Sequence, residues 1–128
     1  MKTLGIDFGL NNFGLAVSEG MLAEPLGQIR VFSPQQAVSK LISTCQENQV
    51  QKIVIGLPEG RLMEKVRKFG EQLKQAINIP VVFQDETLTS KEAIEKMIEA
   101  QKPLKKRQKQ RHVFSACLIL QSYLDDQV

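Results

Sequence analysis

Hydrophobic residues along the chain fall into short strand-like runs that alternate with longer helical patterns. The segments Lys2–Phe8 and Phe13–Glu19 are rich in β-branched and aromatic residues, and a Gly/Asn-rich connection between them is typical of a hairpin. Pro25–Val31 follows as a third strand. The runs Lys52–Pro58 and Asn78–Glu86 are continuously apolar for most of their length, which favours strands that are covered on both faces. We therefore expect five strands.

Helical periodicity occupies the stretches between and after these strands. Ser33 followed by Pro34 resembles a helix N-cap and first turn, and the helix that it begins extends to about Asn48. A second helix has an apolar stripe, and Thr89 with Glu92 matches a capping box at the start of a short third one. The stripe consists of Leu62, Val66, Phe69, Leu73 and Ala76/Ile77. A final helix over residues 113–124 is apolar nearly all round, so we expect it to lie inside the fold against the sheet.

The order of these elements predicts an α/β fold. Three antiparallel strands come first, and the strand, helix, strand, helix, strand order that follows implies right-handed parallel crossovers. We thus expect a mixed sheet flanked by helices. The length of 128 residues, with 42% apolar and 24% charged positions, fits a single domain spanning residues 1–128.

The sequence also indicates the cellular compartment and the oxidation state of the cysteines. The longest apolar runs are too short to cross a bilayer, and the N-terminus lacks the hydrophobic region of a signal peptide, so we expect a cytoplasmic protein. Cys45 and Cys117 lie far apart without the paired spacing of a zinc site. We interpret them as reduced packing residues.

Positive charge is concentrated in one segment, Gln101–His112. It holds six of the 17 Lys and Arg residues and no acid, and the rest of the chain is left with 11 basic residues against 14 acidic ones. Such a local footprint is typical of contact with a phosphate backbone, although a solvated linker has the same composition.

Three potential metal-binding side chains stand at comparable places in the predicted fold. Asp7 ends the first strand, Glu86 ends the last, and His112 precedes the final helix. Sites in open α/β sheets form outside the carboxyl ends of the strands. Because side chains alternate along a strand, Glu86 shares a face with Gln84, and Asp85 points the other way. Only one of the two acids, Asp85 or Glu86, should therefore lie beside Asp7.

This set of groups suits metal-assisted hydrolysis of a phosphodiester bond. Oxygen ligands from separate strands, completed by phosphate oxygens and water, suit Mg²⁺ or Mn²⁺. Such ions activate a water and stabilise charge on the attacking and leaving oxygens. Gly5, Gly9 and Gly14 surround the first of these carboxylates, and their missing side chains let a backbone or a phosphate come close.

Four segments in order resemble one known family: "GIDFGLNNFGLAVSE", "IVIGLPEG", "DETLTSKEA" and "ACLILQSYLD". They resemble the YqgF-like family of pre-16S rRNA nucleases, also described as Holliday-junction-resolvase-like, in the ribonuclease H-like superfamily. The resemblance covers essentially the whole chain. It implies a ribonuclease H-like fold with a five-stranded sheet and a nuclease acting in 5′ maturation of 16S rRNA. It also implies a divalent metal held by three acidic positions, which fall on Asp7, Glu86 and His112.

The third position departs from the family, which usually has Asp where this chain has His112. Nitrogen is a poor ligand for Mg²⁺ and a better one for Mn²⁺, so Mn²⁺ is favoured here. The positive end of the helix dipole should favour the neutral ring that can ligate a metal. Asp125 and Asp126 cannot easily replace it, because 13 residues of helix span about 20 Å.

Two further departures remove positive charge beside the expected phosphate path. The family usually has a Lys/Arg pair where this chain has Asn11 and Asn12, and an Arg where it has Thr87. Residues of the basic segment can supply the missing attraction. The expected substrate-binding residues are therefore Asn11, Asn12, Lys105, Lys106, Arg107, Lys109 and Arg111.

Other interpretations remain open from the sequence. Four-way DNA junctions are an alternative substrate to structured RNA, and resolving them would favour a homodimer over a monomer because two symmetric cuts need two sites. A nucleic-acid-binding protein without catalysis and an ATP-handling module are further hypotheses. Asp7 can be a turn residue, Glu86 can interact with a helix dipole, and His112 can cap a helix or contact substrate. Phe8, Phe13 and Phe114 are core candidates, and any that is exposed can stack on an unpaired base.

Overall fold

The computed structural model describes residues 1–85 and 111–127 and contains the five predicted strands in order. Three helices are described as well, and the short helix expected after Thr89 lies outside the described residues. The strands are β1 (Thr3–Asp7), β2 (Asn12–Ser18), β3 (Glu24–Arg30), β4 (Lys52–Leu57) and β5 (Val81–Asp85); the helices are α1 (Pro34–Asn48), α2 (Leu62–Ala76) and α5 (Arg111–Asp126).

The strands form one mixed sheet in the order β3-β2-β1-β4-β5. β1 pairs antiparallel with β2 and β2 with β3, whereas β1–β4 and β4–β5 are parallel. The prediction of an antiparallel start followed by parallel strands is confirmed. β1 lies at the centre of the sheet, and its carboxyl end lies at the same edge as those of β4 and β5.

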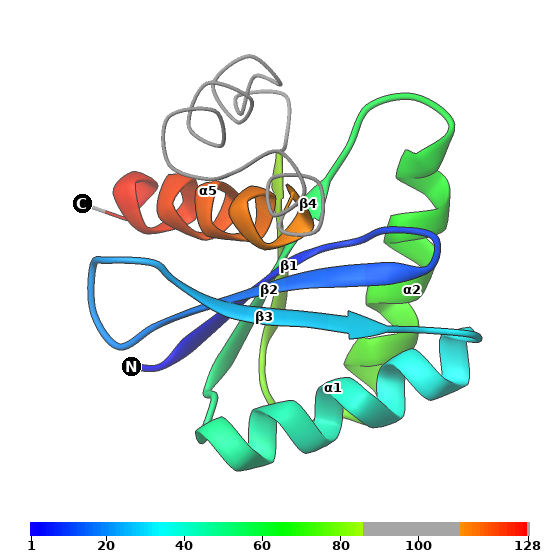
Figure 1. Cartoon of the computed structure of the whole chain (residues 1–128), viewed down its shortest axis with the longest axis horizontal. Coiled ribbons are helices and arrows are strands. Elements are labelled where there is room, and N and C mark those ends of the chain that lie inside the picture. The colour runs from blue at the N-terminus through cyan, green and yellow to red at the C-terminus, as the bar shows by residue number, and fades with distance from the viewer. Residues whose placement is uncertain (86–110, 128) are drawn as a thin grey trace.

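Helices cover both faces of this sheet, with α1 and α2 on one face and α5 on the other (Figure 1). Alternation along β1 sends Leu4 and Ile6 into the core beneath α1 and α2, while Gly5 lies against α5. The apolar final helix packs on the sheet as expected, through Val113, Ala116, Ile119, Leu120 and Leu124. Asp7, two residues after Gly5, is on the α5 face.

Local signals account for the ends of α1. The Ser33 hydroxyl accepts a hydrogen bond from the Gln36 amide at 3.1 Å, and Pro34 is the first helical residue. The helix ends where Gln49 adopts the left-handed conformation, with a φ of 56°.

Both cysteines pack in or against the core. Cys45 is buried, Cys117 is half-buried and both are free thiols, and burial raises the pKa of each to about 11. They are therefore protonated packing residues at neutral pH.

Among the helices of residues 1–85 and 111–127, none is long and apolar enough to cross a membrane.

Candidate active site

A carboxylate and an imidazole meet where β1 ends. The Asp7 side chain leaves the last residue of β1 toward α5, and the residue is only 8% exposed. His112, in the first turn of the described part of α5, places Nδ1 at 2.7 Å from Asp7 Oδ2. Since an ionised carboxylate only accepts, the ring donates its Nδ1–H to Asp7. Two of the three residues proposed from the sequence are therefore in direct contact, although 105 positions separate them.

Glycines allow α5 to approach the sheet closely enough for this contact. Gly14 is the register partner of Asp7, and a methyl group on it would overlap the backbone carbonyl of His112. A methyl group on Gly9 would lie 3.0 Å from the imidazole Cε1, and one on Gly5 would lie 2.7 Å from Leu120 Cβ. At Gly5 and Gly14 the expected close approach is thus made by the backbone and side chains of the helix. At Gly9 the nearest atom is the backbone oxygen of Asn12, with the imidazole next.

The imidazole is biased toward its charged form. The hydrogen bond to Asp7 raises the pKa of His112, the negative charge of Asp7 raises it further, and burial and the nearby Arg111 act in the opposite direction. The expectation that the helix dipole would favour a neutral ring was wrong in direction. A direct charge-assisted hydrogen bond outweighs the dipole, which contributes about 0.3–1 kcal/mol at a partly exposed position.

The donor chemistry of this pair fits a divalent metal ion. Because Nδ1 binds Asp7, Nε2 is the ring nitrogen left for a metal, and metal-bound imidazoles commonly donate their second N–H to a carboxylate. The two ring nitrogens point to opposite sides of the imidazole, so Asp7 and His112 can ligate one ion only if the ring releases its Nδ1–H hydrogen bond and turns. Within residues 1–85 and 111–127, no group of three His, Cys, Asp or Glu side chains converges. Glu86, the third proposed ligand, lies outside the described residues.

The end of β5 shows which of its side chains face α5. Gln84 donates to Ser122 Oγ at 3.3 Å and to Asp126 Oδ2 at 3.1 Å, so it points toward α5, as Asp7 does. Asp85 is exposed and follows Gln84 as the last residue of the strand. Asp125 accepts a hydrogen bond from Gln121 at 3.0 Å on the same helix. Both acids at the end of α5 thus have partners remote from His112, in agreement with the view that they do not replace it.

Pairing of β2 with β3 brings next to Asn12 a cationic residue that the sequence did not reveal. Asn11 is exposed, and Asn12 begins β2, where its register partner is Arg30 of β3. Arg30 is therefore the cross-strand neighbour of Asn12, and its guanidinium carbon lies 5.3 Å from the centroid of the Phe32 ring. Its position depends on a register shift in the β2–β3 pairing, which the hydrophobic pattern does not encode. Arg111 is exposed next to His112, and the other expected basic contacts, Lys105, Lys106, Arg107 and Lys109, lie outside the described residues.

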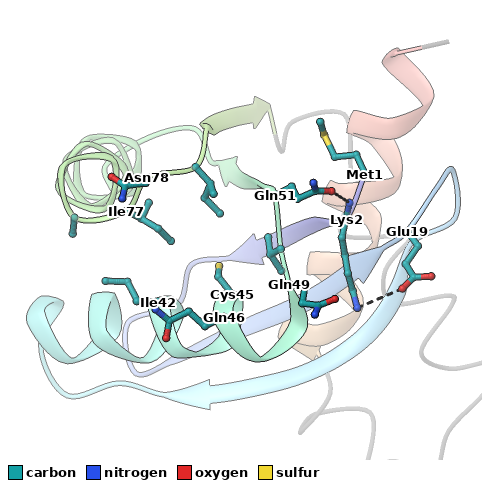
Figure 2. Close-up of a pocket in the computed structure, with 13 residues that line it drawn as sticks. Met1, Lys2, Glu19, Ile42, Cys45, Gln46, Gln49, Gln51, Ile77 and Asn78 are labelled. Carbon is teal, nitrogen blue, oxygen red and sulfur yellow. Dashed lines mark hydrogen bonds and ion pairs between the residues drawn. The ribbon is translucent and has the colours of Figure 1, made fainter.

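A pocket lies at the opposite edge of the sheet, where β1, β4 and β5 begin, and it is separate from this site. It has a volume of about 820 Å³ and is lined by residues that precede β1, β4 and β5, such as Lys2, Gln51 and Asn78. Figure 2 shows Lys2 paired with Glu19, at 3.5 Å, while the Lys2 amide donates to Gln51 Oε1 at 3.1 Å. Asp7 and His112 are not among its lining residues.

Curated proteins include relatives that match nearly the whole length of this chain. Relatives named "Putative pre-16S rRNA nuclease" include one from Caldanaerobacter subterraneus subsp. tengcongensis, 38% identical over 99% of this chain and 98% of the relative. Another, from Syntrophus aciditrophicus, is 39% identical over 98% of this chain and 89% of the relative.

Solved resolvases share the fold at low sequence identity. The Fowlpox virus resolvase in complex with Holliday junction DNA has a TM-score of 0.68 and 13% identity, covering 100% of this chain and 99% of that one. The Thermus thermophilus RuvC in complex with a Holliday junction substrate has a TM-score of 0.64 and 11% identity, covering 99% and 95%. The expected ribonuclease H-like architecture is confirmed by these neighbours. The family model described as RuvX, Holliday junction resolvase, matches residues 1–126, and the chain belongs to that family.

Proposed function

We propose that this protein is a metal-dependent nuclease that cuts structured RNA, with 5′ maturation of pre-16S rRNA as its reaction. Membership of the resolvase family makes the chain a hydrolase of phosphodiester bonds that acts on nucleic acid. The observation that carries the proposal is the Asp7–His112 contact at the carboxyl edge of the sheet, where open α/β sheets place their sites. The RNA substrate is inferred from the names of the curated relatives.

Asp7, Glu86 and His112 are the proposed metal ligands. A bound divalent ion would activate a water and stabilise charge on the phosphate oxygens. Asp7 supplies carboxylate oxygen from a buried position, which keeps bulk water from competing for it. In the observed structure His112 holds that carboxylate through Nδ1–H, and joining it on one ion would require the ring to release this hydrogen bond and turn. We infer that Mn²⁺ suits this set better than Mg²⁺, because one of the three donors is nitrogen.

Binding of the substrate backbone is assigned to cations around this pair. Arg111 adjoins His112 in the chain, and Arg30 pairs with Asn12 across the β2–β3 ladder. Asn11 and Asn12 offer side-chain amides to phosphate or sugar oxygens. The lysines and arginine of the basic segment, which immediately precede Arg111 in the chain, extend this contact. These interactions position the strand without reading its sequence. The cytoplasm is the compartment in which we place this activity.

Cleavage of four-way DNA junctions is the second candidate, favoured by the description of the matching family. Two symmetric cuts require two sites, so this activity would need a homodimer, whereas RNA trimming can be done by a monomer. Comparing the two substrates on one preparation of known oligomeric state separates these functions.

The test is a metal series on precursor 16S rRNA and on a four-way junction. We expect cleavage of the RNA with Mn²⁺, and a loss of about 100-fold or more in Asp7→Asn and Glu86→Gln. His112→Asp should gain activity with Mg²⁺, because it restores an oxygen ligand. Asp125→Asn is the matched control and should cut like the wild type. Failure of the wild type to cut either substrate with Mn²⁺, or an active Asp7→Asn variant, would refute the proposal.

A further inference from the structure

A second pocket opens one residue away from Asp7, on the other face of the sheet. Phe8 follows Asp7 in the chain and packs against the core beneath α1 and α2, whereas Asp7 faces α5. The pocket has a volume of about 320 Å³, which is at the lower end of the range of about 300–1,000 Å³ for ligand sites. Its lining includes Phe8, Leu10, Phe13, Phe32, Lys65 and Lys68.

Aromatic rings form much of this pocket, and they differ in how firmly they are held. The Phe8 ring centroid lies 4.8 Å from that of Phe13 and 5.4 Å from that of Phe69, and the latter two residues are buried. Phe8 is therefore a rigid, half-buried surface backed by the core. Phe32, by contrast, is 73% exposed, and Leu10 is 66% exposed. Core packing does not account for these two exposed apolar side chains beside one hollow.

The rim of the pocket is cationic. Lys65 and Lys68 are exposed and three residues apart on α2, so they project from one side of that helix. Arg30 places its guanidinium carbon 5.3 Å from the centroid of the Phe32 ring. The residues that line this pocket, all within the described part of the chain, include no Asp or Glu. An apolar interior with a basic rim complements a flat aromatic ligand attached to phosphates.

We propose that this pocket receives an unpaired nucleobase of the substrate, next to the phosphate that is cut. The base stacks against Phe8 and Phe32, and Lys65 and Lys68 contact the flanking phosphates. Adjacent Cα atoms are about 3.8 Å apart, so Asp7 and Phe8 can contact neighbouring nucleotides of one nucleic acid strand that bends around the edge of the sheet. The inference rests on the proposed function only in needing a nucleic acid strand at Asp7. It gives the enzyme a preference for unpaired nucleotides beside the cleavage position.

The test measures binding rather than cleavage. A labelled single-stranded RNA, intact or with one abasic position moved along the strand, is titrated with the protein in EDTA and followed by fluorescence anisotropy. Base–aromatic stacking contributes about 1–3 kcal/mol, so we expect one abasic position to weaken binding by about fivefold or more. Phe32→Ala should weaken binding of intact RNA similarly and should no longer distinguish the abasic strand. Leu22→Ala, at an equally exposed position in the β2–β3 connection, is the matched control.

The lysines are tested by the salt dependence of the same titration. Removing one phosphate contact to a single strand lowers the slope of log K against log salt by about 0.7. We expect this change in Lys68→Ala and not in Lys74→Ala, which lies on the same helix outside the pocket and pairs with Glu71. Because Phe32 and Lys68 are exposed, we expect their variants to fold. Melting temperatures equal to that of the wild type would check this.

The proposal is overturned if the wild type does not bind the RNA, if no abasic position matters, or if Phe32→Ala matches Leu22→Ala. These results are independent of the nuclease assay. A protein that cuts rRNA but ignores the abasic position refutes the base pocket alone. One that senses the missing base but does not cut refutes the nuclease proposal alone.

Discussion

Substitution of Gly14 by Ala tests whether close contact between α5 and β2 brings His112 to Asp7. The added methyl group would overlap the backbone carbonyl of His112 and crowd the Val113 amide, which it would meet at 2.7 Å. Backbone atoms within a helix cannot rotate away as a flexible side chain can. α5 must therefore shift as a body, and its buried contacts with Ala16 and Val54 must loosen.

The size of the effect follows from the nature of this overlap. Overpacking of a core by one or a few carbon atoms costs about 1–3 kcal/mol, and a clash with backbone belongs at the upper end. We expect Gly14→Ala to lower the free energy of unfolding by about 3 kcal/mol. For a chain of this size that corresponds to a fall in melting temperature of about 10–15 °C.

The assay is urea unfolding with a matched glycine as the control. A methyl group on Gly20 would meet no atom within 4 Å, and this glycine has no positive φ, so Gly20→Ala should be neutral or stabilise slightly. In Gly14→Ala, any folded protein should also show a lower pKa for His112, because the ring is moved away from Asp7. A variant as stable as Gly20→Ala, with an unchanged histidine titration, would refute the packing argument.

Three other expected outcomes concern the site and the fold. The hydrogen bond to Asp7 raises the pKa of His112, so the pair stabilises the metal-free protein fully below about pH 6.5 and loses this contribution as pH rises through the raised pKa. In urea unfolding, the difference in stability between wild type and Asp7→Asn should therefore be larger at pH 6 than at pH 9. An equal difference at the two pH values would contradict this expectation. Ser33→Ala removes the N-cap of α1 and should cost about 1 kcal/mol, whereas exposed Ser39→Ala on the same helix should cost little; equal melting temperatures would count against the cap. Chelation by EDTA should abolish cleavage, and added Mn²⁺ should restore more activity than added Mg²⁺. Greater recovery with Mg²⁺ would disprove this ranking.

The hydrophobic pattern was sufficient for the elements and their order because each strand and helix has one clear periodicity. The continuous apolar run at Lys52–Leu57 and the stripe on α2 identified a parallel crossover, and topology then placed the end of β1 at the carboxyl edge of the parallel strands. The contact between Asp7 and His112 could be expected for the same reason. Local sequence and strand topology together limit where these two side chains can lie.

Features that depend on tertiary register could not be predicted in the same way. Arg30 lies opposite Asn12 only because the β2–β3 pairing shifts by one residue at Leu15/Ala16. Lys65 and Lys68 resemble ordinary surface residues of an amphipathic helix until α2 is packed beside Phe8. The direction of the His112 pKa was missed because a dipole argument ignores the one hydrogen bond that dominates it. Such effects are set by distances of a few ångströms between segments far apart in the chain.

The most direct test of the central claim uses the fact that the chain has a single histidine. Paramagnetic Mn²⁺ broadens the NMR signals of nuclei close to it, so the imidazole resonances report on His112 without assignment. If Asp7 and His112 belong to the metal site, substoichiometric Mn²⁺ will broaden these signals in the wild type and will do so far less in Asp7→Asn. Sharp imidazole signals at Mn²⁺ concentrations that support full cleavage would contradict the account.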